Sequence, residues 1–214
     1  MIWKSRWYPR LVFLACLIPL AFYLWKWRNH ELGINAAEFS ERYLGRTTLR
    51  FLLLTLSITP LRRIAGLGGL IRVRRMLGLF TFFYGCLHAL YYFAFDAQWN
   101  RQVIWEDLTI RRFFIFGMLA LTLMAPLAAT SFDGAVRWMG GRNWQRLHRL
   151  IFVSGAVAII HFGLQAKTLV LRPVYYGAVL MLLLLVRVVL AARKRIAPSV
   201  RLKGKMESPK VSPL

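Results

Sequence analysis

The chain has 214 residues, of which 58% are hydrophobic, and its mean hydropathy of +0.49 is far above that of a soluble domain. Its formal net charge is +22, from 30 Lys and Arg against 8 Asp and Glu, but these basic residues form short clusters between apolar stretches about as long as a bilayer is thick. This arrangement is typical of a membrane protein and weighs against nucleic acid as a partner, which would need one basic, water-facing surface.

Six apolar segments follow one another along the chain, and each approaches the roughly 20 residues of a transmembrane helix. In chain order they cover residues 9–27, 47–64, 76–95, 113–132, 147–166 and 174–192. The second has the shortest apolar core, so a five-span protein is the main alternative. We therefore expect an all-α, polytopic membrane helical bundle with six transmembrane helices.

The distribution of charge predicts the topology of these spans. Most Lys and Arg fall in the first residues, in the even-numbered loops and in the last residues, which the positive-inside rule assigns to the cytoplasm. No small-residue cleavage site follows the first apolar run, which predicts an uncleaved span. We expect both termini to be cytoplasmic, one transmembrane domain over 1–196, and a basic, disordered cytoplasmic tail over 197–214.

Histidines within the predicted spans are the strongest functional candidates, since ionisable groups are costly in a bilayer. His88 lies in the third span and His161 in the fifth, which His148 opens; His30 lies in a polar loop and is expected to be solvated. Two imidazoles that face each other across a bundle can ligate the iron of a low-spin haem. The alternative is that each histidine only hydrogen-bonds a neighbouring helix.

One face of the third span groups small residues with ionisable ones. On a helical wheel, Arg74, Gly78, Gly85 and His88 fall within a narrow sector. The glycines indicate either ordinary close packing of helices or room for a flat macrocycle, and both interpretations stay open. A guanidinium has no free lone pair for iron, so we expect Arg74 to bind a haem propionate.

The spacing of these residues predicts two levels within the bundle. Arg74 and His88 are about 21 Å apart along a helix, and His148 and His161 are about 20 Å apart. Arg74 and His148 would share the cytoplasmic level, and His88 and His161 the outer one. On one ideal helix, however, His148 and His161 point about 140° apart, and local tightening near Ser154 and Gly155 is one way to reconcile them.

Three stretches of the sequence together resemble a known family. They are GRTTLRFLLLTLSITPLRR, RVRRMLGLFTFFYGCLHALYY and NWQRLHRLIFVSGAVAIIH, and the similarity covers roughly residues 45–192. They look like MsrQ (formerly YedZ), the haem-binding membrane subunit of the bacterial periplasmic methionine sulfoxide reductase system. The resemblance implies the ferric-reductase-like transmembrane superfamily, in which two helices carry two haem-ligating histidines each.

The resemblance also implies cofactors and partners. This chain has three such histidines, with Arg74 in place of the fourth, so one haem b at His88 and His161 is implied, and a second near His148 has its ligation left open. The family passes electrons from the quinone pool or a cytosolic flavin reductase, across the bacterial inner membrane, to MsrP, a periplasmic molybdenum-cofactor subunit that reduces oxidised methionine. FMN is also associated with the family, although no motif here would place it.

Two other functions fit the same spans. One is a self-contained ferric or quinone reductase that uses the same haems. The other is a transporter or channel in which His88 and His161 relay protons or bind a metal. No GxGxxG motif follows a strand, so a nicotinamide-binding domain is not expected and electrons must come from another protein or from quinol.

Overall fold

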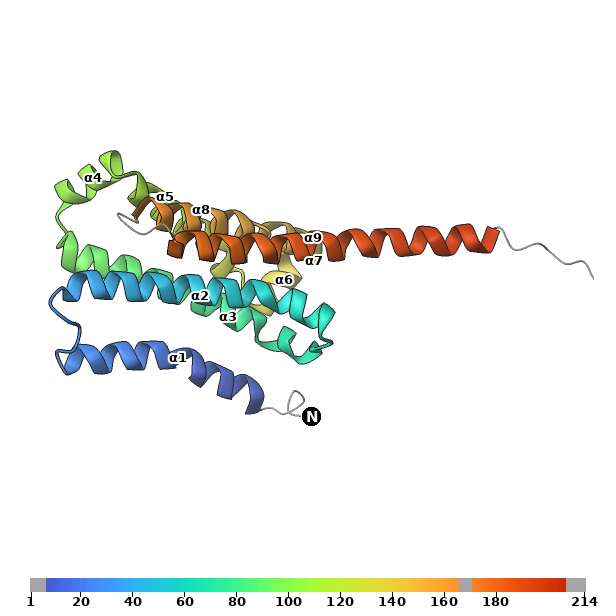
Figure 1. Cartoon of the computed structure of the whole chain (residues 1–214), viewed down its shortest axis with the longest axis horizontal. Helices are drawn as coiled ribbons and strands as arrows, with labels where there is room; N and C mark the ends of the chain where they lie inside the picture. Colours follow the sequence, from blue (N-terminus) through green and yellow to red (C-terminus); the bar gives the residue numbers. More distant parts are fainter. Residues whose placement is uncertain (1–6, 166–170, 207–214) are drawn as a thin grey trace, which may run out of the picture.

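The computed structural model describes residues 7–165 and 171–206, with side chains up to Arg193. Throughout these residues the chain is helical and contains no strand, and six long helices lie side by side in a bundle (Figure 1). The long helices are α1 (Trp7–Arg28), α2 (Ala36–Ile64), α3 (Ile71–Tyr91), α5 (Arg112–Ala129), α8 (Leu150–Gln165) and α9 (Leu171–Met206). Shorter elements lie at the bundle ends: η2 (Gly68–Leu70), the π-helical η3 (Tyr92–Asp96), α4 (Arg101–Ile110), α6 (Asp133–Met139) and α7 (Gly141–Leu147).

Five stretches of the described chain are long and apolar enough to cross a membrane. They are Trp7–Arg28, Gly68–Asp96, Arg112–Ala129, Gly141–Gln165 and Leu171–Arg193. Of the six long helices, α2 is the one that lies in none of these stretches. Its first and last turns carry charged residues. It nevertheless runs along the length of the bundle, packed against α3 and α9 (Figure 1). The all-helical bundle is therefore confirmed, whereas the count of six spans stays a prediction.

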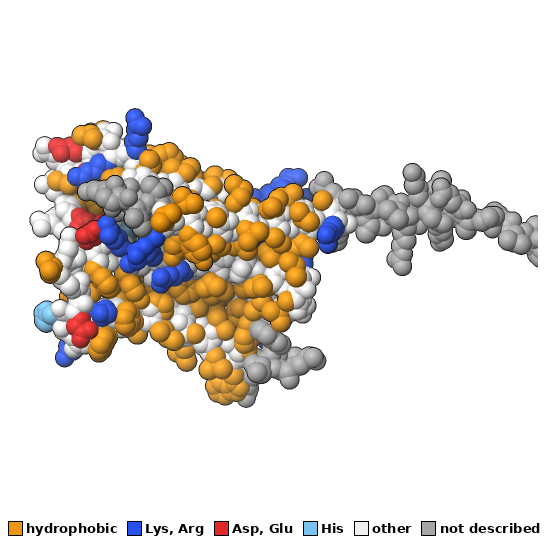
Figure 2. Space-filling view, viewed as in Figure 1, with side chains coloured by type: hydrophobic (Ala, Val, Ile, Leu, Met, Phe, Trp, Pro, Cys, Tyr) orange, Lys and Arg blue, Asp and Glu red, His pale blue; other side chains and the backbone are white. Residues whose placement is uncertain are grey.

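The sides of the bundle are apolar and its charges lie mainly toward its ends. Hydrophobic side chains cover most of the visible lateral surface, and the visible acidic side chains gather at the end that carries α4 (Figure 2). Large apolar residues such as Met181 and Val188 on α9 are mostly exposed, which suits lipid rather than water. The chain is thus a multi-pass membrane protein. We refer to its two ends as the α4 end and the α7 end.

The most buried helix is α2, which explains why it needs less apolar surface than its neighbours. Its buried residues are Ser40, Leu44, Thr47, Leu49, Phe51, Leu52, Thr55, Leu56, Ile58 and Pro60. It packs between α3 on one side and α8 and α9 on the other. A helix surrounded by protein does not have to be apolar toward lipid. A criterion based on composition can therefore miss such a helix as a membrane span.

Tyr84 on α3 connects α1 to the interior of the bundle through two hydrogen bonds. Its hydroxyl donates to the carbonyl oxygen of Cys16 (2.8 Å) and accepts from the backbone N–H of Leu20 (3.1 Å). These two backbone groups are four residues apart, so the hydroxyl is inserted where α1 would make its own hydrogen bond. Pro19 lies in the same turn, and Tyr43 donates to its carbonyl oxygen (2.8 Å). Two tyrosines thus hydrogen-bond to backbone groups of α1 around Pro19.

The fifth predicted span is interrupted, but the interruption does not lie near Ser154 and Gly155. α8 runs without interruption through Ser154 and Gly155, both buried, and the Ser154 hydroxyl donates to the carbonyl oxygen of Ala120 on α5 (2.9 Å). The interruption falls instead at His148 and Arg149, between α7 and α8. His148 and His161 are therefore not on one continuous helix, which removes the 140° conflict that an ideal helix would impose.

α9 is longer than the predicted span and extends beyond the bundle (Figure 1). Its helix reaches Met206 and so enters segment 197–214, for which the sequence predicts a disordered tail. Residues 207–214 lie outside the described part of the chain, and the division of the chain after residue 196 stays a prediction.

Candidate functional site

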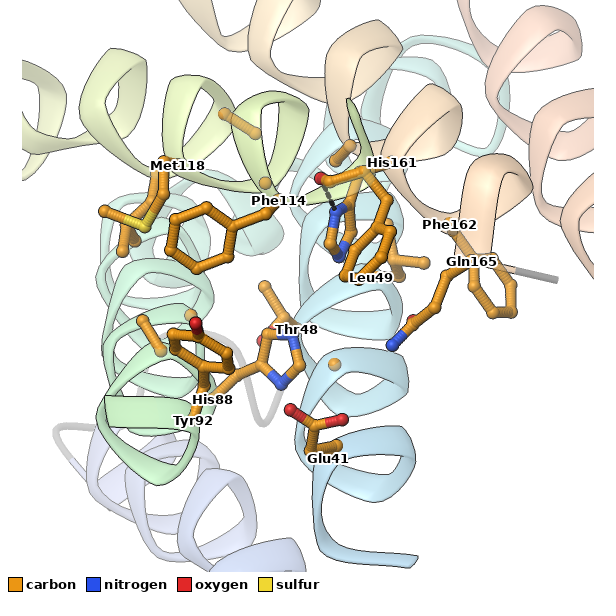
Figure 3. A pocket seen from close by; sticks show the side chains of 18 of the residues that line it. Glu41, Thr48, Leu49, His88, Tyr92, Phe114, Met118, His161, Phe162 and Gln165 are labelled. Carbon is orange, nitrogen blue, oxygen red and sulfur yellow. Dashed lines mark hydrogen bonds between the residues drawn. The ribbon is translucent and has the colours of Figure 1, made fainter. Parts of the chain in front are cut away.

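His88 and His161 come from different helices and lie next to each other inside the bundle (Figure 3). His88 is on α3 and His161 on α8, and their ring centroids are 6.2 Å apart with an interplanar angle of 70°. Imidazole–metal bonds are about 2 Å long, so two imidazoles on opposite sides of one metal have centroids about 6 Å apart. The spacing therefore matches that of a pair of axial ligands.

The ring of His161 is oriented by a hydrogen bond to α5. Its Nδ1 lies 2.6 Å from the carbonyl oxygen of Phe113, so Nδ1–H is the donor and Nε2 keeps its lone pair. Such a bond fixes both the tautomer and the direction of a ligating histidine. Nε2 is thus the atom of His161 that is available to a metal.

His88 contacts the backbone of α2 in a similar position. Its ring lies against Gly45, where an added Cβ would be 3.4 Å from Cε1 of the ring. The backbone of Glu41, one turn before Gly45 on α2, lies beside this ring. Nδ1 of His88 is nevertheless buried without a hydrogen-bond partner. The ring is therefore enclosed by protein while one of its polar atoms remains unsatisfied.

Glycines allow both imidazoles to approach neighbouring helices. A Cβ added to Gly117 on α5 would lie 2.8 Å from two ring atoms of His161, closer than side chains tolerate. Gly117 follows Phe113 by one turn, as Gly45 follows Glu41, so each ring lies over a glycine beside the carbonyl four residues earlier. The sequence analysis did not select Gly45 or Gly117. No pattern on α2 or α5 alone distinguishes these two glycines, because their close neighbours are histidines of other helices.

The two glycines predicted on α3 have different surroundings. Gly85 lines the cavity that contains both histidines, and its added Cβ would meet Leu121 at 3.2 Å. Gly78 meets only a methyl group of Thr55, at 3.7 Å, and does not line that cavity. Gly85 is therefore placed beside the histidines, whereas the surroundings of Gly78 are those of ordinary helix packing.

The cavity between the histidines has apolar walls and a polar rim. Aromatic and aliphatic side chains form the walls, among them Phe114, Met118 and Phe162 (Figure 3). The rim includes Glu41 and Arg46, and a polar cleft continues from it toward the α4 end. A haem needs two nitrogen ligands, flat apolar walls and cations for its propionates. The residues around His88 and His161 fit this group.

His148 lies at a second level, near the α7 end. It caps α7, its Nδ1 is 3.1 Å from the carbonyl oxygen of Trp144, and its ring stacks on the indole of Trp144 with centroids 3.8 Å apart. Its Nε2 is buried without a hydrogen-bond partner. Arg74 acts electrostatically on this ring, which places the two in the same region as the sequence predicted.

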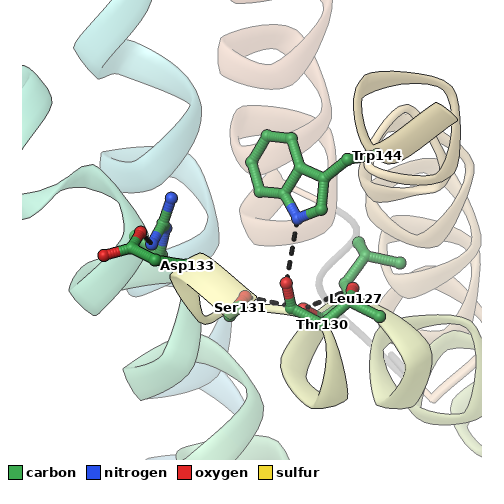
Figure 4. Close-up of polar contacts among 6 residues, drawn as sticks. Leu127, Thr130, Ser131, Asp133 and Trp144 are labelled. Carbon is green, nitrogen blue, oxygen red and sulfur yellow. Dashed lines mark hydrogen bonds and ion pairs between the residues drawn. The ribbon is translucent and has the colours of Figure 1, made fainter. Parts of the chain in front are cut away.

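Trp144 is itself held by loop contacts at the α7 end (Figure 4). Its indole Nε1 donates to the carbonyl oxygen of Thr130 (2.9 Å), and the guanidinium of Arg75 lies 5.7 Å from its ring centroid. Arg75 also pairs with Asp133 at the start of α6, and this guanidinium lowers the pKa of the exposed Asp133 carboxyl. The loop that carries His148 is thereby anchored to α3.

Comparison with known proteins places the chain in a family. Residues 44–159 match the ferric reductase like transmembrane component family. A protein of Rhodospirillum rubrum, named protein-methionine-sulfoxide reductase heme-binding subunit MsrQ, is 42% identical over 184 residues, which are 86% of this chain and 88% of that protein.

Two further relatives carry the same name. The protein of Herminiimonas arsenicoxydans is 42% identical over 187 residues, with 86% of each chain covered. That of Bordetella pertussis is 44% identical over 187 residues, with 86% of this chain and 90% of the relative covered. The family match covers His88 and His148 and ends two residues before His161. The chain therefore belongs to the MsrQ family of ferric-reductase-like transmembrane components.

Proposed function

We propose that this chain is the haem b-binding electron-transfer subunit of a protein-methionine-sulfoxide reductase, and that His88 and His161 are the axial ligands of one haem. The observation that carries the proposal is the pairing of these imidazoles, with centroids 6.2 Å apart, inside an apolar cavity. The relatives are named as heme-binding subunits, which agrees with this use of the cavity. A second haem, near His148, belongs to the same proposal.

The residues of the chain would hold the haem and tune it. His161 presents Nε2 because Nδ1–H is donated to Phe113, and the apolar walls keep water from the iron. Arg42 and Arg46, on the rim, are placed to bind propionates through charge-assisted hydrogen bonds. Bound in this way, haem iron supplies a one-electron redox couple within the bilayer.

The proposal includes the partners that the family resemblance implies. Electrons would enter from the quinone pool or from a cytosolic flavin reductase and leave to MsrP, the periplasmic molybdenum-containing subunit. Sulfoxide reduction, and hence repair of oxidised periplasmic proteins, would occur on MsrP and not on this chain. FMN, if carried, would be an additional redox group. The chain would span the bacterial inner membrane six times with both termini in the cytoplasm.

The test is a haem count on the purified protein. Pyridine haemochrome quantitation and an absorption spectrum should be recorded for wild type, His88→Ala, His161→Ala and His148→Ala. We expect the first two variants to lose the same haem, since a low-spin centre needs both imidazoles. We expect His148→Ala to keep that haem and to lose the second one.

His30→Asn is the matched control, because His30 is exposed and lies at the α4 end outside the cavity. A full haem complement in His88→Ala or in His161→Ala would contradict the pairing. A colourless wild type despite supplied haem would instead favour a transporter. High turnover of ferric chelates by the purified chain alone would favour a self-contained reductase.

A further inference from the structure

Arg187 is a charged residue within the apolar stretch Leu171–Arg193 of α9. Its side chain points between helices: Nη2 donates to the carbonyl oxygen of Leu56 on α2 (2.7 Å), and the guanidinium carbon lies 5.1 Å from the ring centroid of Phe152 on α8. A guanidinium within the membrane costs free energy unless it is paired. We therefore expect a group nearby that pairs with it.

The Leu56 carbonyl oxygen accepts a hydrogen bond from one of the N–H donors of Arg187. In a regular helix this oxygen would accept from the N–H four residues later, but that residue is Pro60, which has none. Arg187 takes the place of the missing donor. The contact uses one of five N–H groups, and Nε of Arg187 is buried without a hydrogen-bond partner. A neutral donor would have satisfied Leu56, so the charge itself remains unexplained.

Other cations lie nearby, and they make the charge less favourable. Arg74 and Arg63 are the charged groups that act on Arg187, and Arg74 also acts on His148. Six of the eight acidic residues of the sequence belong to elements at the α4 end: Glu31, Glu38, Glu41, Asp96, Glu106 and Asp107. Of the other two, Asp133 pairs with Arg75, and Glu207 lies outside the described residues. Within the described chain, the cations around Arg187 thus have no protein carboxylate as counter-charge.

We propose that Arg187 and Arg74 bind an anionic group of a non-protein ligand at the α7-side level, a carboxylate or a phosphate. A guanidinium fork suits such planar or tetrahedral oxyanions through charge-assisted hydrogen bonds. The unsatisfied Nε–H of Arg187 is the donor that such a ligand would meet. The carboxylate source is a haem propionate, and the phosphate sources are a flavin nucleotide and a phospholipid headgroup. The propionate and flavin alternatives rest on the proposed function, whereas the phospholipid alternative does not.

The experiment must separate anion binding from the contact with Leu56. Pro60→Ala restores an N–H at residue 60, which can bond to the Leu56 carbonyl in the normal helical way. In that background, Arg187→Gln removes the charge without leaving a backbone carbonyl unsatisfied. Arg74→Gln, which leaves the hydrogen bond between Arg187 and Leu56 in place, is the second variant. Arg193→Gln, exposed on the same helix, is the control.

Three quantities should be measured on each purified protein: haem per chain by pyridine haemochrome, FMN released by denaturation, and tightly bound phospholipid by phosphorus assay. We expect Arg187→Gln and Arg74→Gln to weaken retention of one of these ligands at least about thirtyfold, as for loss of a buried charged partner. The Soret band of the His88 and His161 haem should persist, and it reports that the bundle is folded.

Which ligand is lost identifies its source. Equal retention of all three ligands in wild type and in Pro60→Ala/Arg187→Gln would overturn the proposal and leave Arg187 as a purely structural donor. If wild type binds no haem, the proposed function fails, yet loss of FMN or of phospholipid from the Arg187 variants would still support this site. If the double variant does not fold, the same comparison is made with Arg74→Gln, whose unchanged retention would overturn the proposal.

Discussion

The two levels of the bundle are built from the same residue types in different ways. At the α4-side level, two imidazoles face each other at 6.2 Å, and each lies over a glycine of a neighbouring helix. At the α7-side level, one imidazole stacks on Trp144 and is accompanied by arginines rather than by a second histidine. The first level is arranged like a symmetric ligand pair. The second is arranged around cations.

This difference shows where the bundle is sterically constrained. The position of His161 depends on a close approach to α5, which the missing side chain of Gly117 permits and the Phe113 carbonyl directs. The position of His148 depends on the end of a short helix and on loop contacts. We therefore expect the α4-side level to respond strongly to added volume, and the α7-side level to respond to changes in charge and loop anchoring.

The largest effect should come from Gly117→Ala. The new methyl group would lie 2.8 Å from the ring of His161, so the imidazole must shift and its hydrogen bond to Phe113 must lengthen. Overpacking of this kind costs about 1–3 kcal/mol. We expect a lower haem-to-protein ratio after purification and altered EPR g values of the remaining haem.

Gly163→Ala is the matched control for this variant. Gly163 is on α8, two residues after His161, and an added Cβ has nothing within 4 Å. It should keep the haem content and spectrum of wild type. An unchanged spectrum in Gly117→Ala would show that the close approach to α5 is not required for the ligand pair.

A smaller effect should distinguish the two glycines of α3. Alanine at Gly85 would meet Leu121 at 3.2 Å beside the cavity, whereas alanine at Gly78 would make an ordinary 3.7 Å contact with Thr55. Alanine favours a helix over glycine by up to about 1 kcal/mol, so Gly78→Ala should keep or raise thermal stability. Gly85→Ala should lose that gain and release haem at a lower temperature, as followed by Soret absorbance during heating. Equal melting curves for Gly85→Ala and Gly78→Ala would mean that the Leu121 side chain can move aside without loss of stability.

The sequence predicted these features to different extents, for physical reasons. Apolar length predicted the long helices, and the depth of His88 and His161 predicted that they would meet, because position along a helix translates directly into depth. The break at His148 was not predicted, since no proline or glycine lies at residues 148 and 149. Gly45 and Gly117 were missed because their role depends on side chains from other helices, which no single-helix pattern contains. The sequence analysis did not single out Arg187, since its hydrogen bond to Leu56 depends on Pro60 of another helix.

The smallest effect concerns the anchoring of the α7-side loop by Asp133. The Arg75 guanidinium lowers the pKa of the Asp133 carboxyl, so folding favours its ionised form. The resulting stabilisation is complete above the unfolded-state pKa of about 4 and is lost as the pH falls through the lower folded-state value. Asp133→Asn lacks this contribution at every pH.

The melting temperature of wild type should therefore exceed that of Asp133→Asn by about a degree at neutral pH, since an exposed pair contributes little. The difference should shrink as the pH falls below 4, because the wild-type carboxyl is then protonated and the pair with Arg75 is lost. Haem bound at His88 and His161 should be unaffected, because that pair lies at the other level of the bundle. A difference that grew on acidification would mean that the carboxylate destabilises the loop, contrary to the contact with Arg75.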